Sequence, residues 1–172
     1  MKKMYFNMFW TLALCLMTFI GTAQTDKTTR PSPLMEANGI IHGTTIKVTY
    51  SSPSVKGRVV WGDLVPYGKV WRTGANEATI FETDKDIKIN GEKLAAGKYG
   101  LFTIPGENEW TLIFNAVWDQ WGAFKYDQAK DVLRVKVKAE KSSTFNEQLA
   151  FDIKDKMVVL SWENLTVAVD VK

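Results

Sequence analysis

The segment LRVKVKAE, residues 133–140, alternates strictly between apolar and charged side chains. Leu133 and Val135 would lie on one face of an extended chain, and Arg134 and Lys136 on the other, because successive side chains of a strand point to opposite faces. This is the pattern of an antiparallel strand that has one face on a core and one in water. Its Lys-rich face also discourages edge-to-edge aggregation. The segment therefore predicts an all-β fold.

The same two-residue period recurs on both sides of this segment. Asn90-Gly91 follows Ile87 and Ile89 and is a strong hairpin signal, because both turn positions tolerate positive φ. A further turn is predicted near Asn164, and no segment beyond residue 24 has a long helical pattern. Strands about a dozen residues apart predict a single antiparallel β-sandwich or a partly closed barrel. The other alternating runs are residues 46–50, 99–104, 110–116, 149–153, 158–162 and 165–171.

The first residues have the pattern of a secretory signal peptide. Lys2 and Lys3 precede an apolar run over residues 4–20, and the small residues 21–23 then form a cleavage site. The apolar run is slightly short of the roughly 20 residues that a membrane-spanning helix needs. We therefore expect residues 1–23 to be removed, leaving no membrane span.

The remaining chain is expected to form one domain. Residues 24–38 are polar and include two prolines, so they are predicted to be an extended lead-in that packs along a sheet edge. Residues 39–172 are predicted to be a single β domain, because they contain no repeat and no low-complexity linker.

Charge and cysteine content exclude several classes of protein. The 172 residues include 22 basic and 19 acidic side chains, and removal of the signal peptide leaves 149 residues with a net charge of +1. No basic stripe remains, so we expect no nucleic-acid partner. The only cysteine, Cys15, leaves with the signal peptide, which excludes a disulfide framework. With a single histidine and no calcium-loop spacing, we expect no metal site and no cofactor. No pattern indicates an oligomeric state.

Two stretches, residues 51–82 and 115–126, do not alternate. The first is rich in glycine and contains Trp61, Tyr67 and Trp71 among charged residues, and the second reads NAVWDQWGAFKY. Loops on a rigid β scaffold are where binding residues concentrate.

Four blocks in and around these stretches resemble a known family. They are YSSPSVKGR (50–58), WGDLVPYGKVWRTGANEAT (61–79), INGEKLAAGKYGLFTIPG (89–106) and FNAVWDQWGAFKYD (114–127). The chain resembles a bacterial secreted family catalogued as "domain of unknown function 2911", and residues 71–77 match its central motif. The resemblance implies an exported β-rich domain, periplasmic or extracellular, and brings no activity with it.

The motif WRTGANEA, residues 71–78, has two interpretations. In the functional one, Arg72 offers a planar fork of donors for a carboxylate or phosphate, Asn76 an amide and Glu77 a carboxylate. Gly74 would permit a turn with positive φ, so that Arg72 and Glu77 face each other over a pocket floored by Trp71 and Tyr67. In the structural one, Arg72 pairs with Glu77 or Glu82 and Trp71 fills the core.

The favoured hypothesis is a non-catalytic binding module for a small or glycan-like ligand. Aromatic faces stack on the apolar faces of sugars, while a few polar groups bind hydroxyls. Trp110 and Trp162 lie on predicted core faces, so they are core candidates. The candidate binding residues are Trp61, Tyr67, Trp71, Arg72, Asn76, Glu77, Trp118 and Trp121.

Two alternatives remain open. One is a glycosidase-like hydrolase that uses the same aromatic cleft, with Glu77 as acid or base and Asp63 or Glu82 as the second carboxylate. The other is an envelope protein–protein interaction module, which a buried and mutually paired Arg72 and Glu77 would favour. A serine triad is disfavoured, because no G-x-S-x-G elbow surrounds Ser51 or Ser52 and His42 is expected in an exposed turn.

Overall fold

A computed structural model describes residues 26–172, and the predicted signal peptide lies outside this range. The regular secondary structure of the described chain consists of strands and one short 3-10 helix, Gln128–Lys130. The strands are β1 (Leu34–Ile41), β2 (Thr44–Ser51), β3 (Thr79–Thr83), β4 (Ile87–Ile89), β5 (Glu92–Leu94), β6 (Gly97–Ile104), β7 (Glu109–Asn115), β8 (Asp131–Lys154) and β9 (Met157–Asp170).

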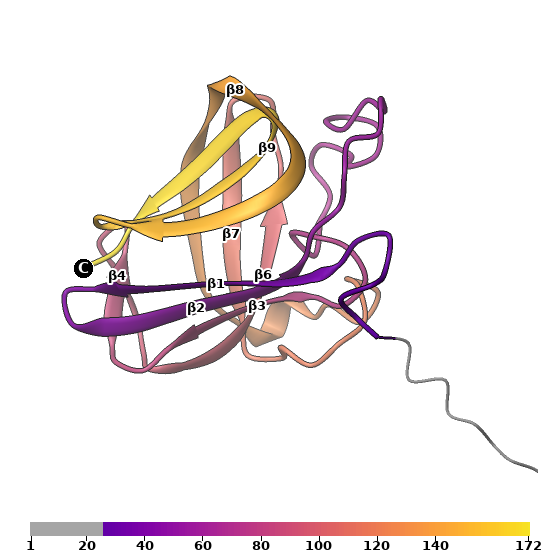
Figure 1. Ribbon diagram of the computed structural model, residues 1–172. Coiled ribbons are helices and arrows are strands. Elements are labelled where there is room, and N and C mark those ends of the chain that lie inside the picture. Colours follow the sequence, from indigo (N-terminus) through magenta and orange to yellow (C-terminus); the bar gives the residue numbers. More distant parts are fainter. Residues whose placement is uncertain (1–25) are drawn as a thin grey trace, which may run out of the picture.

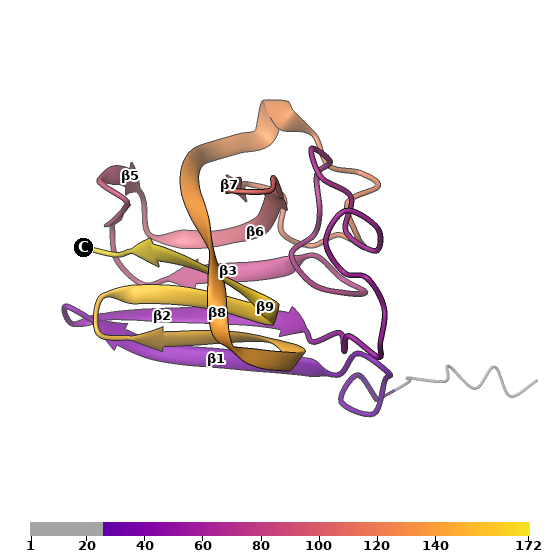
Figure 2. The same ribbon diagram turned by 90° about the horizontal axis from the view of Figure 1, so that it is seen from above.

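Seven of these strands form one antiparallel sheet that is nearly closed into a barrel. Its order is β1-β2-β3-β6-β7-β8-β9, and β4 and β5 form a separate hairpin. Figures 1 and 2 show the long strands β8 and β9 bending over β1 and β2, so that the two ends of the sheet face each other. The prediction of an all-β, partly closed barrel is confirmed.

The long strands differ in detail from the sequence prediction. Two separate strands were expected in residues 133–140 and 149–153, but β8 runs through both as one strand, with register shifts opposite β9 between Lys141 and Ala150. β9 likewise continues past Asn164, and the expected turn is only a local irregularity at Glu163, whose φ is 54°. β1 begins at Leu34, so the end of the predicted lead-in is a paired strand at the sheet edge.

Backbone hydrogen bonds between the end of β2 and β8 bring the two ends of the sheet together. The Leu149 amide donates to the Pro53 carbonyl, and the Val55 amide donates to the Glu147 carbonyl. Within the barrel the Phe151 amide also donates to the Tyr50 hydroxyl. These bonds satisfy backbone groups that an open sheet edge would leave unpaired.

Four tryptophans form the centre of the core. Trp110 and Trp162 are fully buried, as their strand faces predict, and Trp61 and Trp71 from the irregular segment pack edge-on or stacked against them. Ring centroids of contacting pairs are 5.0 to 6.2 Å apart. The four indoles thus fix the irregular segment onto the sheet, because contacts at this spacing are favourable beyond the area they bury.

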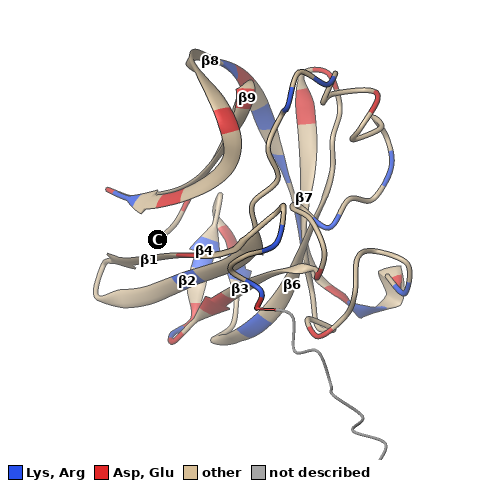
Figure 3. Ribbon diagram, turned by 45° about the vertical axis from the view of Figure 1, so that its right-hand side comes forward, with Lys and Arg blue, Asp and Glu red and all other residues tan. Residues whose placement is uncertain are grey.

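Two predicted turns are confirmed as hairpins. His42 and Gly43 connect β1 to β2, and Asn90 and Gly91 connect β4 to β5, all four with positive φ. His42 is exposed and precedes β2, whereas Ser51 ends that eight-residue strand, so the two side chains lie at opposite ends of β2. None of the helices in residues 26–172 is long and apolar enough to cross a membrane. Basic and acidic residues are interspersed along the strands (Figure 3).

Candidate functional site

An open hollow of about 550 Å³ lies beside the loop that connects β7 to β8. A narrower hollow of about 200 Å³ adjoins it, and the two share Lys27, Glu77, Asp119 and Gln120. Trp121, Phe124 and Lys125 line the wider hollow, and Trp118 lines the narrower one. Trp121 is 56% exposed and Phe124 85%, so both rings offer free apolar surface to a ligand.

The WRTGANEA segment forms the corner from which this site is built. Trp71 points into the core and its indole donates to the Gly74 carbonyl at 3.0 Å. Gly74 is required for close approach rather than for a positive φ, because a Cβ there would lie 3.0 Å from the Ser51 carbonyl oxygen. Thr73 and Asn76 instead adopt positive φ, at 56° and 55°. For a β-branched threonine this conformation is strained, and such strain is typical of functional or tightly packed corners.

The end of the motif pairs with the aromatic loop. The Gly122 amide donates to the Asn76 carbonyl and the Ala78 amide donates to the Gln120 carbonyl, both at 3.0 Å. Glu77 and Trp121 therefore lie opposite each other in a short antiparallel bridge. This bridge brings together two segments more than 40 residues apart and positions both side chains on the hollow.

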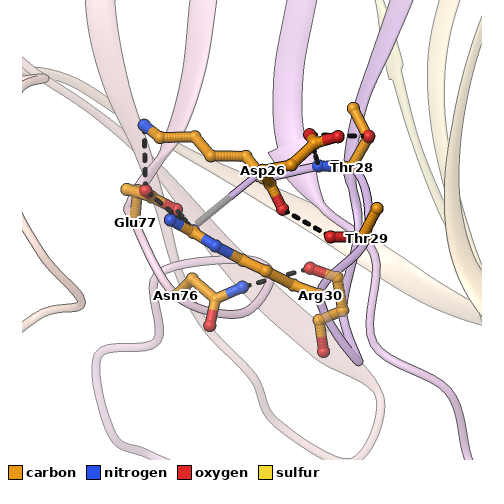
Figure 4. Close-up of polar contacts among 8 residues, drawn as sticks. Asp26, Thr28, Thr29, Arg30, Asn76 and Glu77 are labelled. Carbon is orange, nitrogen blue, oxygen red and sulfur yellow. Dashed lines mark hydrogen bonds and ion pairs between the residues drawn. The ribbon is translucent and has the colours of Figure 1, made fainter. Parts of the chain in front are cut away.

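The N-terminal segment docks on the same corner (Figure 4). Arg30 Nη1 donates to both carboxylate oxygens of Glu77 at 3.0 Å, and Lys27 Nζ lies 3.0 Å from one of them. The Asn76 amide donates to the Ser32 carbonyl at 3.1 Å. The Leu34 amide closes this segment into a loop by donating to the Lys27 carbonyl. Residues 27–34 thus form a strap held by two side chains of the motif.

These contacts change the acidity of Glu77. Burial alone would raise the pKa of its carboxyl, but a hydrogen bond from its own backbone amide and the donors on Arg30 and Lys27 outweigh that effect. The net result is a pKa below the ordinary value. Glu77 is therefore an ionised carboxylate at neutral pH, partly neutralised by two cations.

A buried polar network anchors the aromatic loop at its two ends. Asn115, fully buried at the end of β7, donates to Asp131 at the start of β8 at 2.8 Å. The Tyr126 hydroxyl donates to the other Asp131 oxygen at 2.6 Å. Burial, together with the neighbouring Asp131 carboxylate, raises the pKa of Tyr126 well above its ordinary value. The network thus links the end of β7, the start of β8 and Tyr126 of the loop between them.

Arg72 has a different environment from the other polar residues of the motif. Its side chain is half-buried, and its Nη1 lies 3.6 Å from the position that a Gly122 Cβ would take. Its Nε is buried and has no hydrogen-bond partner among the described residues. Burial lowers the pKa of its guanidinium, which nevertheless stays charged in proteins. Arg72 is thus not paired with Glu77, so the geometry matches neither an Arg72–Glu77 pocket nor a mutually paired corner.

The structure brings together only part of the predicted set. Glu77, Trp118 and Trp121 line the hollows, with Asn76 behind them and Arg72 beside Gly122. Lys98 Nζ lies 4.0 Å from the centroid of the Trp118 ring and covers one of its faces. Trp61 and Trp71 pack in the core instead, and Tyr67 lies against Gly62 in another turn.

Six residues of the site were not among the sequence candidates. Four of them stand in the quoted NAVWDQWGAFKY block, whose aromatic residues beside a glycine were the available signal. The two in the N-terminal strap gave no local signal, because their roles depend on contacts with a distant segment. The six are Lys27, Arg30, Asp119, Gln120, Phe124 and Lys125.

The remaining carboxylates considered for catalysis lie elsewhere. Glu82 on β3 faces Lys98 at 3.8 Å, and Asp63 is exposed in the glycine-rich segment. Within residues 26–172 no group of three or more His, Cys, Asp or Glu side chains is arranged to hold a metal ion.

Comparison with known proteins gave one match. The profile of a family described as "Protein of unknown function (DUF2911)" matches residues 32–171, which is most of the chain. Neither a curated protein nor a solved structure matches the chain significantly.

Proposed function

The chain belongs to the DUF2911 family of proteins of unknown function, and from its own side chains we propose that it is a non-catalytic binding protein for a small, glycan-like ligand. The family assignment confirms the resemblance found in the sequence and adds no activity to it. The proposal rests on one observation: two exposed aromatic rings stand beside carboxylate and amide groups in an open hollow.

The hollow has the composition that sugar recognition requires. Trp121 and Phe124 present apolar faces on which a pyranose ring would stack, while Asp119 and Gln120 would bind its hydroxyl groups. A volume of about 550 Å³ is within the range of small-molecule sites and suits one or two sugar units. Hydrogen bonds tie the β7–β8 loop to the motif and to Asp131, and a site supported in this way lowers the entropic cost of binding.

Binding is favoured over glycosidase-like hydrolysis by the state of Glu77. A catalytic acid needs a pKa raised toward neutrality, whereas the pKa of Glu77 is lowered by its hydrogen bonds and cationic neighbours. Both of its oxygens also accept from Arg30, so neither is free to deliver a proton.

We also propose that the protein acts outside the cytoplasm, in the periplasm or beyond. The support is the pattern of residues 1–23, which lie outside the described part of the chain. Mass spectrometry of the protein isolated from its native cells would test this, since cleavage before Gln24 is expected and an intact Met1 would contradict it.

A glycan array followed by titration calorimetry tests the binding function. Wild-type protein should bind at least one oligosaccharide, and Trp121→Ala should weaken that binding about tenfold or more, because a stacked tryptophan commonly dominates a binding site. Phe145→Ala on β8 is the matched control, since Phe145 is about as exposed as Trp121 and lies outside the hollow. A wild-type protein that binds no oligosaccharide, or binds equally after Trp121→Ala, would overturn the proposal.

A further inference from the structure

Within residues 26–172, the side chain of one of the four arginines has no partner. Arg30 pairs with Glu77, Arg58 donates to the backbone carbonyl of Val55 at 3.0 Å, and Arg134 lies 3.7 Å from Asp131. The Arg72 side chain makes no ion pair or hydrogen bond with any other residue of the described part of the chain, and its Nε is shielded from solvent. A guanidinium cannot escape this situation by losing its proton, because it remains charged throughout the normal pH range.

Such an arrangement costs stability. A buried charge or donor without a partner loses its hydration without a compensating bond. An unsatisfied buried group in a folded protein calls for an explanation, and a bound ligand that supplies the missing partner is one. The planar fork of arginine matches the two oxygens of a carboxylate or sulfate, so the missing partner would be an oxyanion.

Arg72 lies beside the proposed ligand site. Its Nη1 and the Phe124 ring both come within 4 Å of the position that a Gly122 Cβ would take. Gly122 separates Trp121 from the segment leading to Phe124, and both aromatic residues line the wider hollow. The absence of a side chain at Gly122 therefore leaves the guanidinium and the aromatic ring next to each other.

The charge around the hollow also favours an anion. Lys27 and Lys125 line it, and Arg30 adds a third cation by pairing with Glu77. The lining itself holds two cations and two carboxylates, Glu77 and Asp119, and the neighbouring Arg30 and Arg72 add two further positive charges. A ligand with a negative group would thus meet a site of complementary charge.

We propose that the ligand is an acidic saccharide whose carboxylate or sulfate group is bound by Arg72 while its ring stacks on the aromatic loop. This inference rests on the proposed function and specifies its ligand class. The shared chemistry is an oxyanion on a sugar, and the probes below distinguish carboxylate from sulfate.

The test compares acidic and neutral oligosaccharides on wild-type protein and variants. The probes are oligogalacturonate, alginate and hyaluronan oligomers, their methyl esters as neutral counterparts, and carrageenan oligomers, which carry sulfate and no carboxylate. Wild-type protein should bind an acidic oligomer at least about tenfold more tightly than its neutral counterpart, the size of one charge-assisted hydrogen bond. Arg72→Gln should remove this preference, Arg72→Lys should restore only part of it, and the control Arg58→Gln should keep it.

A second readout is independent of ligand. Because Arg72 has no partner, Arg72→Gln should leave the melting temperature unchanged or raise it, whereas removal of a structural arginine would lower it. An Arg72→Gln variant that unfolds overturns the inference, and so does a wild-type protein that binds an acidic oligomer and its ester equally. In the second case, if Trp121→Ala abolishes binding of both the acid and the ester, the proposed binding function still holds. Failure of every oligosaccharide to bind overturns both proposals.

Discussion

The ion pair between the N-terminal strap and the motif makes a sharp prediction for Glu77→Gln. The substitution keeps the shape of the side chain but removes the charge that Arg30 and Lys27 contact at 3.0 Å. The Arg30 and Glu77 side chains are 19% and 26% exposed, so the pair lies between a surface salt bridge, worth about 0–1 kcal/mol, and a buried one, whose breakage costs about 3–5 kcal/mol. We expect a loss of about 2 kcal/mol in the free energy of unfolding, or about 4–8 °C in melting temperature.

The loss should depend on pH. The pKa of Glu77 is lower in the folded protein than its ordinary value of 4.5, so its contribution is fully present above that value. It disappears as the pH falls through the folded-state pKa, where the carboxylate becomes protonated. The difference between wild type and Glu77→Gln in urea denaturation should therefore be large at pH 7 and shrink as the pH is lowered below 4.5.

A double-mutant cycle and a control complete the experiment. Arg30→Gln should lower the free energy of unfolding by an amount similar to that of Glu77→Gln. The double variant should be little less stable than either single variant, because the two residues take part in one interaction. Glu82→Gln should lose less than about 0.5 kcal/mol, since its partner Lys98 is 3.8 Å away and both side chains are well exposed. If Glu77→Gln costs no more than Glu82→Gln, or costs the same at pH 3 as at pH 7, the reasoning is refuted.

Three further substitutions probe the barrel and the aromatic loop. Gly39→Ala should lower the free energy of unfolding by about 1–3 kcal/mol, because the new Cβ would lie 2.8 Å from Ile153 Cβ and 2.9 Å from the Ile153 carbonyl oxygen. A stability in urea equal to that of wild type would show that β1 and β8 are not packed this closely. Trp110→Ala should lower the free energy of unfolding by about 3–5 kcal/mol, whereas that of Trp121→Ala should stay within about 0.5 kcal/mol of wild type in the same assay. Equal losses of stability would contradict the division into core and site tryptophans. Because the pKa of Tyr126 is raised in the folded protein, its protonated hydroxyl contributes fully to stability at pH values below the ordinary tyrosine pKa near 10, and this contribution falls as the pH rises above that value. The free energy of unfolding measured between pH 9 and 11 should therefore depend less on pH in Tyr126→Phe than in wild type. Identical pH profiles would refute this.

The parts of the fold that depend on local pattern were predictable. The alternation around Val135 and the Asn90-Gly91 turn correspond to β8 and the β4–β5 hairpin. The continuity of β8 through residues 142–148 was not predictable, because those residues are mainly polar. They are kept extended by contacts with distant chain, such as the Val55 amide on the Glu147 carbonyl.

The site was less accessible to sequence reasoning than the fold. The density of aromatic and charged residues correctly drew attention to the two irregular segments, but it did not distinguish Trp71, which turns into the core, from Trp121, which faces the hollow. Thr73 rather than Gly74 adopts positive φ in the motif, and no pattern assigns such a conformation to threonine. The pairing of Arg30 with Glu77 joins residues 47 positions apart and has no local signature.

Closure of the barrel also determines when the molecule becomes stable as its chain folds. The bonds from Ser52 to Leu149 and from Phe151 to Tyr50 join positions 97 and 101 residues apart. We expect contacts at such separation to form late, because closing a long loop costs entropy before any contact repays it. Until they form, the ends of β2 and β8 expose unpaired backbone groups, and an incomplete chain is prone to associate with others. A slow final docking of β8 is thus the step at which this chain is most vulnerable, and most dependent on being kept apart from its own copies.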